Sequence, residues 1–190
     1  MIYIIRHGQT ELNSRQVLQG RSDHPLNKAG IQQACQARDR LKGIRFSHVF
    51  TSPLIRAIQT AEIIVPYAKP VIDERLIEMD SGPYEGADLK NLPQEVIAFF
   101  RDFVHVPAPE GMEQLDSVVR RAGEFLEEIR SLDGDILIST HAIAMKGLLE
   151  YLTPESGGSY WSKNIGNCAV YTVDNQYGRF SLPQEMHDGK

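Results

Sequence analysis

Near its start the chain carries the run Ile2-Tyr3-Ile4-Ile5, which leads directly into Arg6-His7-Gly8. The β-branched and aromatic side chains of this run predict a short buried strand, and Gly8 ends it. A second apolar run, Ile136-Leu137-Ile138, leads in the same way into Ser139-Thr140-His141. Two predicted strands that are far apart in the sequence therefore both end at a histidine.

The rest of the chain alternates between strand and helix patterns. Further strands are predicted at residues 48–51 and 71–73, and helices at residues 27–41, 54–64, 92–104, 113–131 and 142–152. Asn27 is the predicted cap of the first of these helices. Residues 169–173 and 178–181 are predicted to form a terminal hairpin or edge strands, and the residues after them to be frayed.

This alternation predicts an α/β fold with three layers, in which a mainly parallel central sheet lies between helices. We expect residues 1–190 to form a single domain. Residues 83–112 interrupt the alternation, and we predict that they form a small helical insert that caps the site. The apolar residues between positions 96 and 104 favour core packing, with contact to an apolar leaving group as the alternative.

The composition limits the possible partners. Of the 190 residues, 42% are hydrophobic and 24% are charged, which is ordinary for a globular domain. The net charge of −5 at pH 7 predicts neither a nucleic-acid partner nor a membrane partner, and no apolar stretch is long enough to span a bilayer. The cysteines, Cys35 and Cys168, form no CxxC pair, so we expect core packing in a reducing, cytoplasmic setting. The oligomeric state is left open.

Three predicted strands lead into polar segments. The segments are Arg6-His7-Gly8, Ser52-Pro53-Leu54-Ile55-Arg56 and Ser139-Thr140-His141. Ligands of open α/β sheets bind beyond the carboxyl ends of the strands, so we expect these segments to meet in one site. Such a site is cationic in an otherwise acidic protein, and arginine presents a planar fork of donors that matches phosphate oxygens. The sequence therefore predicts an anionic ligand.

The histidines suggest nucleophilic chemistry at this site. An imidazole that is held at one nitrogen by a backbone hydrogen bond offers the other nitrogen as a nucleophile. No Asp/Glu cluster with metal-ligand spacing accompanies His7 and His141, so we expect neither a metal nor another cofactor. A metal hydrolase that uses these histidines is the disfavoured alternative, and we expect insensitivity to a chelator.

Six segments of the sequence resemble the histidine phosphatase superfamily, the phosphoglycerate-mutase-like proteins. In chain order they are Arg6-His7-Gly8-Gln9-Thr10 with Asn13; Gln19-Gly20 with Asp23-His24-Pro25-Leu26; Ser52-Pro53-Leu54-Ile55-Arg56-Ala57-Ile58-Gln59-Thr60-Ala61; Leu76 to Gly86; Pro109-Glu110-Gly111-Met112-Glu113; and Ser139-Thr140-His141. The chain departs from the family pattern at Tyr84, where Trp is usual, and at Met112. The resemblance covers roughly residues 1–172.

The resemblance implies a role for each matched catalytic position. His7 is expected to attack phosphorus in line and to become a phosphohistidine. Arg6, Arg56 and His141 are expected to hold the phosphoryl oxygens. Glu78 is expected to protonate the leaving oxygen and then to help a water molecule attack the phosphoenzyme.

The resemblance also implies residues that bind the phosphate or the substrate. Asn13 and Gln19 are expected to add polar contacts, and Gly8 and Gly20 are expected to lie beside the phosphate, where Gly8 lets the backbone come close. The assignment of the acid is open to alternatives, because three other carboxylates lie close to Glu78 in the sequence. They are Glu74, Asp80 and Glu85.

The predicted reaction is hydrolysis of a phosphomonoester of a small metabolite. A mutase needs extra cations above the site, and between positions 86 and 111 the basic residues are Lys90 and Arg101, besides His105. A phosphoglycerate-mutase-type transferase and a catalytically weak phospholigand-binding module remain the alternatives. The sequence does not identify the substrate.

Overall fold

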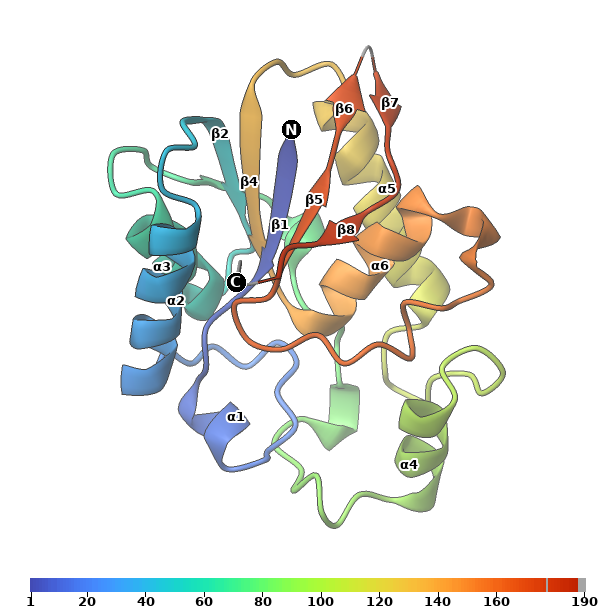
Figure 1. The fold of residues 1–190 in the computed structure, drawn as a ribbon. Helices are drawn as coiled ribbons and strands as arrows, with labels where there is room; N and C mark the ends of the chain where they lie inside the picture. Colours follow the sequence, from blue (N-terminus) through green and yellow to red (C-terminus); the bar gives the residue numbers. More distant parts are fainter. Residues whose placement is uncertain (177, 188–190) are drawn as a thin grey trace.

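The computed structural model describes residues 1–176 and 178–187. A six-stranded sheet with the order β3-β2-β4-β1-β5-β8 runs through the molecule (Figure 1). The strands are β1 (Ile2–Arg6), β2 (Phe46–Thr51), β3 (Val71–Ile72), β4 (Asp135–Thr140), β5 (Val170–Val173) and β8 (Gln184–Glu185). The first four are parallel to one another, whereas β5 and β8 are antiparallel additions at one edge. The predicted α/β fold with a mainly parallel sheet is confirmed.

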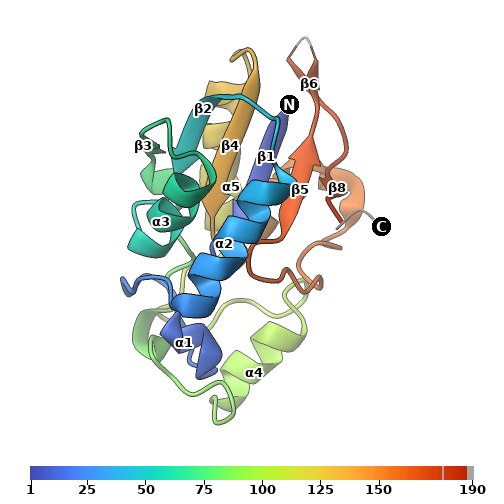
Figure 2. The same cartoon turned by 60° about the vertical axis from the view of Figure 1, so that its left-hand side comes forward.

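Helices cover both faces of the sheet. α2 (Lys28–Arg40) and α3 (Ile55–Ile64) lie on one face, and α5 (Leu115–Ile129) and α6 (Ala142–Leu152) lie on the other (Figure 2). The predicted cap of α2 is confirmed, because the Asn27 side chain accepts a hydrogen bond from the Gly30 N–H. In the described part of the chain, no helix has the length and apolar character needed to cross a membrane.

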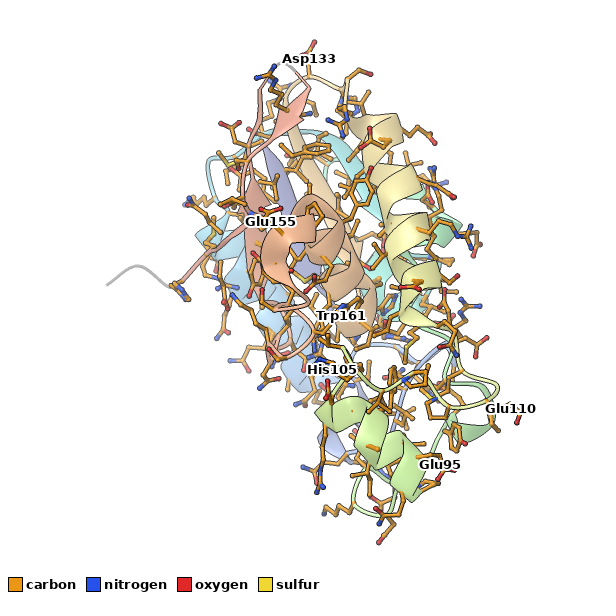
Figure 3. The ribbon with its side chains drawn as sticks, turned by 90° about the vertical axis from the view of Figure 1, so that its right-hand side faces the viewer. Glu95, His105, Glu110, Asp133, Glu155 and Trp161 are labelled. Atoms are coloured by element: carbon orange, nitrogen blue, oxygen red, sulfur yellow. The ribbon has the colours of Figure 1, made fainter. Side chains whose placement is uncertain are left out.

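Two short helices lie beyond the carboxyl ends of the parallel strands. They are α1 (Glu11–Ser14) and α4 (Gln94–Arg101), with α4 near the lower end of the molecule in Figure 1. Figure 3 shows the segment that carries α4 projecting from the main body, with Glu95 and Glu110 at its outer side. Single-turn 3-10 helices lie at Glu74–Leu76, Gly82–Tyr84 and Pro154–Ser156.

The helix predicted at residues 92–104 is shorter in the structure. α4 ends at Arg101 because Asp102 leaves the helical conformation and its carboxylate accepts a hydrogen bond from the His105 N–H. Such a local side-chain bond competes with helix continuation. Phe99 is buried in a small separate cluster with Met79 and Met112. Val96 is also buried, whereas Val104 is 50% exposed.

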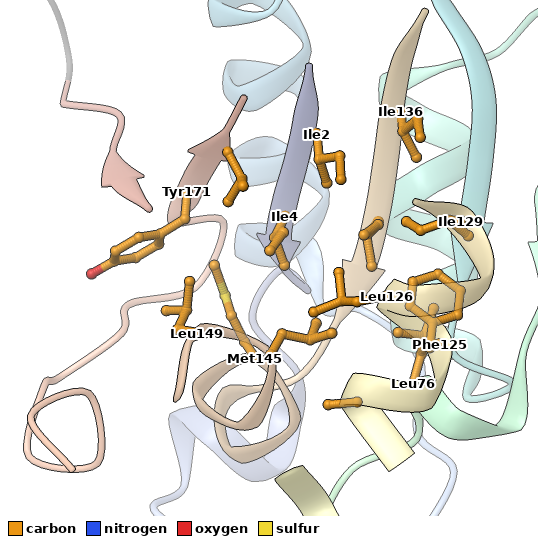
Figure 4. Packing of buried hydrophobic residues seen from close by; sticks show 14 of the residues in the cluster. Ile2, Ile4, Leu76, Phe125, Leu126, Ile129, Ile136, Met145, Leu149 and Tyr171 are labelled. Carbon is orange, nitrogen blue, oxygen red and sulfur yellow. The ribbon is translucent and has the colours of Figure 1, made fainter. Parts of the chain in front are cut away.

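The two sides of β1 build two different cores. Ile2 and Ile4 pack with residues of α5 and α6, as Figure 4 shows, whereas Tyr3 and Ile5 pack with residues of α2 and α3. This follows from the alternation of side chains along a strand. Cys168 is buried in the second core, whereas Cys35 is only partly buried, so the predicted core packing holds fully only for Cys168.

The prediction for the end of the chain is wrong in its pairing. β5 pairs with β1 and β8, and a separate hairpin is formed by β6 (Asn175–Gln176) and β7 (Arg179–Phe180). The expected frayed tail contains β8, in which the Gln184 and Glu185 backbone extends the sheet beside Thr172 and Tyr171. The remaining tail residues, 188–190, lie outside the described residues.

Candidate active site

His7 and His141 meet at the carboxyl ends of two neighbouring strands. β1 and β4 are paired in parallel with Arg6 opposite Thr140, so the next residue of each strand is a histidine. The two ring centroids are 5.1 Å apart, and the rings are inclined by 59°. The predicted convergence of these two residues is confirmed by this geometry.

The hydrogen bond of His7 determines its tautomer. Its Nδ1 lies 2.6 Å from the Gly8 carbonyl oxygen, which can only accept, so Nδ1 carries the proton and Nε2 carries a lone pair. The side chain is buried, and burial together with the charges of Arg56 and Arg6 holds the pKa of His7 well below its ordinary value of 6.5. His7 is therefore a neutral imidazole with a nucleophilic nitrogen at neutral pH.

His141 is also neutral, and both of its ring nitrogens are engaged. Arg56 Nε donates to Nδ1 at 3.2 Å, so the proton is on Nε2, which donates to Ser52 Oγ at 2.6 Å. Burial, followed by the charge of Arg56, holds the pKa of His141 well below 6.5. Sequence reasoning quoted Ser52 only as part of a motif and missed its contact with His141.

Arg56 is completely buried and is held in one orientation. Its Nη1 and Nη2 atoms donate to the carbonyl oxygens of Ser22 and Gly20 at 2.8 and 2.6 Å. Burial lowers the pKa of Arg56 to about 10, so the guanidinium remains charged at neutral pH. Each terminal nitrogen keeps a second N–H for another acceptor, since arginine has five donors.

Two buried donors near the histidines have no acceptor. Arg6 Nε and Gln19 Nε2 lack a hydrogen-bond partner among the residues that the structure describes. Arg6 Nη1 is anchored on the Ile165 carbonyl oxygen at 2.5 Å, and Gln19 Oε1 accepts from Thr10 Oγ1 at 2.7 Å. Buried donors are nearly always paired, so these two mark a place for an acceptor-rich ligand.

The Glu78 side chain contacts the first turn of α6. One carboxylate oxygen accepts from the Met79 and Ala144 N–H groups at 2.8 and 3.0 Å, and the other accepts from the Ile143 N–H at 3.2 Å. The side chain is 6% exposed and is close enough to Arg6 and Arg56 for its charge to act on both. The structure thus brings Glu78 to the same site as the arginines.

The neighbouring carboxylates have other tasks. Glu85 accepts from the Gly20, Arg21 and Ser22 N–H groups and from the Ser22 hydroxyl. Asp80 accepts from Arg21 and from the Gly82 N–H. Both carboxylates hold loops, which leaves Glu78 as the acid candidate that contacts α6.

Glu74, the remaining alternative acid, lies in the first turn of a 3-10 helix and is exposed. In the described part of the chain, no group of three His, Cys, Asp or Glu side chains is arranged to hold a metal ion.

The expected glycines and Asn13 serve local packing in the structure. A Cβ atom at Gly8 would lie 2.5 Å from the Gly30 carbonyl oxygen, so the close approach at Gly8 is to α2. A Cβ atom at Gly20 would lie 2.6 Å from both Glu85 and Ser81 side-chain oxygens. Asn13 closes a capping box with Thr10 at the start of α1. Direct contact of these three residues with a substrate stays a prediction.

Comparison with known proteins gives this arrangement a family. Residues 2–185 match the model of the histidine phosphatase superfamily, branch 1. The chain is 31% identical over 183 residues to a probable phosphoglycerate mutase, GpmB, of Escherichia coli O1:K1 / APEC, with 92% of this chain and 85% of that protein covered.

Solved structures show the same similarity. A phosphoserine phosphatase of Entamoeba histolytica in complex with 3-phosphoglyceric acid has a TM-score of 0.85 and 25% identity, with 98% of this chain and 96% of that chain covered. Bacillus stearothermophilus YhfR has a TM-score of 0.80 and 30% identity, with 95% and 94% covered.

The chain belongs to the histidine phosphatase superfamily, and the resemblance noted in the sequence is confirmed. The family and the relatives named above support an enzyme of phosphatase or mutase type.

Proposed function

We propose that the chain is a metal-independent phosphomonoester hydrolase of the histidine acid type, which forms a phosphohistidine at Nε2 of His7. The free, unprotonated Nε2 of a neutral His7 is the observation that carries this assignment. The substrate is a small phosphorylated metabolite, and the setting is cytoplasmic, in keeping with the free thiols of Cys35 and Cys168.

The first step transfers the phosphoryl group to the enzyme. The Nε2 lone pair attacks phosphorus while the bond from phosphorus to the leaving oxygen breaks, and Glu78 delivers a proton to that oxygen. Arg6 Nε and Gln19 Nε2, which have no acceptor among the described residues, and the remaining N–H groups of Arg56 hold the phosphoryl oxygens. Positioned donors of this kind contribute about 10²–10³ each in rate.

The second step hydrolyses the phosphoenzyme. Water attacks phosphorus, Glu78 takes up the proton of the water, and the bond from phosphorus to Nε2 breaks, which regenerates neutral His7 and releases inorganic phosphate. His141 orients Arg56 through Nδ1, and its Nε2–H, now donated to Ser52, is the group through which it reaches a phosphoryl oxygen.

The first measurement is hydrolysis of p-nitrophenyl phosphate in excess chelator. We expect wild-type turnover to survive the chelator and His7→Ala to fall to background, because no other described residue offers a comparable nucleophile at this position. His187→Ala is the control, since His187 is exposed near the end of the described chain. Activity lost to the chelator, or kept in His7→Ala, contradicts the mechanism.

A mutase is the second candidate, favoured by the similarity to GpmB. Incubation with 3-phosphoglycerate, with and without a bisphosphoglycerate primer, separates the two reactions. A hydrolase releases inorganic phosphate and needs no primer, whereas a mutase yields 2-phosphoglycerate and depends on the primer.

A further inference from the structure

Lys146 is a buried lysine beside the proposed active site that the reaction above does not use. It lies on α6 and is 7% exposed, three residues after Ile143, whose N–H donates to Glu78, so the two residues share a helix face. Its Nζ donates to the Trp161 carbonyl oxygen at 2.7 Å and lies 5.0 Å from the centre of the Phe103 ring.

The ammonium group of Lys146 is incompletely paired. An ammonium has three donors, and the Trp161 carbonyl accepts one of them. Among the residues that the structure describes, no carboxylate forms an ion pair with Lys146. Buried charges are normally paired, so this lysine has the properties of a binding group for an external anion.

The backbone places Lys146 close to the phosphate donors. The segment 161–165 offers the Trp161 carbonyl to Lys146 and the Ile165 carbonyl to Arg6. Four residues span at most about 14 Å, which limits the separation of the two carbonyl groups that hold these cations. The charges of Glu78 and Arg6 both act on the ammonium, and burial lowers the pKa of Lys146 to about 8.

A cavity opens beside this ammonium. It has a volume of about 330 Å³, and its lining includes Phe100, Arg101, Phe103, Lys146, Trp161 and Lys163. Figure 3 shows Trp161 where the main body meets the segment that carries α4. The cavity therefore combines aromatic rings from the predicted cap and from the 161–164 loop with a buried cation from α6.

We propose that this cavity is the leaving-group subsite and that Lys146 binds a carboxylate on the leaving group. Phe103 and Trp161 pack against the carbon skeleton between the carboxylate and the phosphoryl group. Among the cations that line the cavity, Arg101 and Lys163 are exposed and Lys146 is buried. The two N–H groups of Lys146 that have no acceptor among the described residues match the two oxygens of a carboxylate. This inference rests on the proposed function, because it assigns the substrate class of that site.

The subsite also bears on the sequence-based argument against a mutase, which rested on a lack of extra cations above the site. That reasoning counted basic residues only between positions 86 and 111, whereas the buried cation comes from α6, outside the predicted cap. The small number of basic residues between positions 86 and 111 therefore does not exclude a substrate with a second negative charge.

A matched pair of substrates tests the subsite. 3-Phosphoglycerate and glycerol 3-phosphate have the same three-carbon skeleton. The first has a carboxylate at the carbon where the second has a hydroxymethyl group. We expect the wild-type enzyme to prefer 3-phosphoglycerate, and Lys146→Met to lower kcat/KM for it by about tenfold or more, chiefly through KM. In the same variant, kcat/KM for glycerol 3-phosphate and for p-nitrophenyl phosphate should stay within about twofold of wild type, because neither substrate has a carboxylate for Lys146 to bind.

Two further variants separate a direct contact from a general loss of charge or of fold. Lys69→Met removes the same charge from an exposed lysine outside this cavity and should leave the preference intact. Lys146→Arg keeps the charge and should restore part of the preference. A wild-type enzyme without the preference, or an equal loss on both substrates in Lys146→Met, overturns the subsite.

Binding without turnover distinguishes the subsite from the reaction. Trp161 is the only tryptophan of the chain, so its fluorescence reports occupation of the cavity in His7→Ala. We expect 3-phosphoglycerate to bind this variant more tightly than glycerol 3-phosphate, and the difference to vanish when Lys146→Met is added. If the wild type hydrolyses no phosphomonoester but the binding difference persists, the proposed reaction fails and the subsite stands. If hydrolysis occurs but the binding difference is absent, only the subsite fails.

Discussion

Individual side chains carry the chemistry of this site through their hydrogen-bond state. His7 and His141 are neutral for the same reason, namely burial beside arginines that stay charged. They differ in what is left free, because His7 keeps an unengaged Nε2 whereas both nitrogens of His141 have partners. This asymmetry makes His7 the nucleophile and His141 the support.

The lowered pKa of His7 predicts its behaviour on acidification. A histidine with a lowered pKa loses its proton at a lower pH than usual. His7 should therefore remain neutral as the pH falls from 8 to 6.5, the ordinary pKa of histidine. Titration of the imidazole carbon-bound proton by NMR, with the signal assigned by comparison with His7→Ala, measures this. A midpoint at 6.5 or above for His7 would contradict the lowering of its pKa by burial and by the two arginines.

At the scale of elements, the loop that contains residues 20–22 holds Arg56 in place. The loop offers the Gly20 and Ser22 carbonyls to Arg56, and its N–H groups in turn donate to Glu85. Glu85 thus positions Arg56 indirectly, through the backbone of Gly20 and Ser22. Its position just after a 3-10 helix at Gly82–Tyr84 joins the start of the predicted cap to the phosphate donors.

Removing the Glu85 carboxylate, which holds the loop at residues 20–22, should reduce catalysis without removing a catalytic group. We expect Glu85→Ala to lower kcat on p-nitrophenyl phosphate by up to about 10²-fold, because small displacements of positioned groups have effects of this size. Glu85→Gln, which keeps an acceptor oxygen, should be milder. Glu62→Ala on the exposed side of α3 removes the same charge and serves as the control. An unchanged kcat in Glu85→Ala would mean that Arg56 is oriented without the loop.

The whole molecule consists of a sheet core and a smaller outlying cluster. β1 and β4 each have a paired strand on both sides and are buried on both faces, whereas α4 packs through the small cluster around Phe99 and Met79. Regions with few buried contacts open at lower free energy than the main core. We therefore expect the α4 segment, which lines part of the proposed subsite, to open at lower free energy than the sheet core.

Native-state hydrogen exchange should show this difference. We expect amides of β1 and β4 to exchange only with global unfolding, and amides of residues 94–106 to exchange through local opening at lower denaturant. α5 is the matched helical control, because it packs directly on the sheet. Equal protection of α4 and α5 would place the α4 segment in the main cooperative unit.

Local patterns in the sequence were sufficient for the central strands and the helices that flank them. The buried strand β1, the Asn27 cap and the limits of α6 depend on residues within a few positions of one another, and each was predicted correctly. The pairing of β5 with β8 was not predicted, because it depends on which edge of the sheet is open once β1 is paired with β4.

The sequence by itself determined the α/β fold and which residues gather at the strand ends. It did so because strand and helix periodicity are local, and parallel strands bring their carboxyl ends to one edge. Only the tertiary structure decided which ring nitrogen of His7 is free, that Glu85 clamps a loop, and that Lys146 lies by the site. Those facts depend on hydrogen bonds and burial between segments distant in the chain, such as Lys146 with Trp161 and Glu85 with Gly20. No spacing rule encodes such partners, because packing of whole elements sets them.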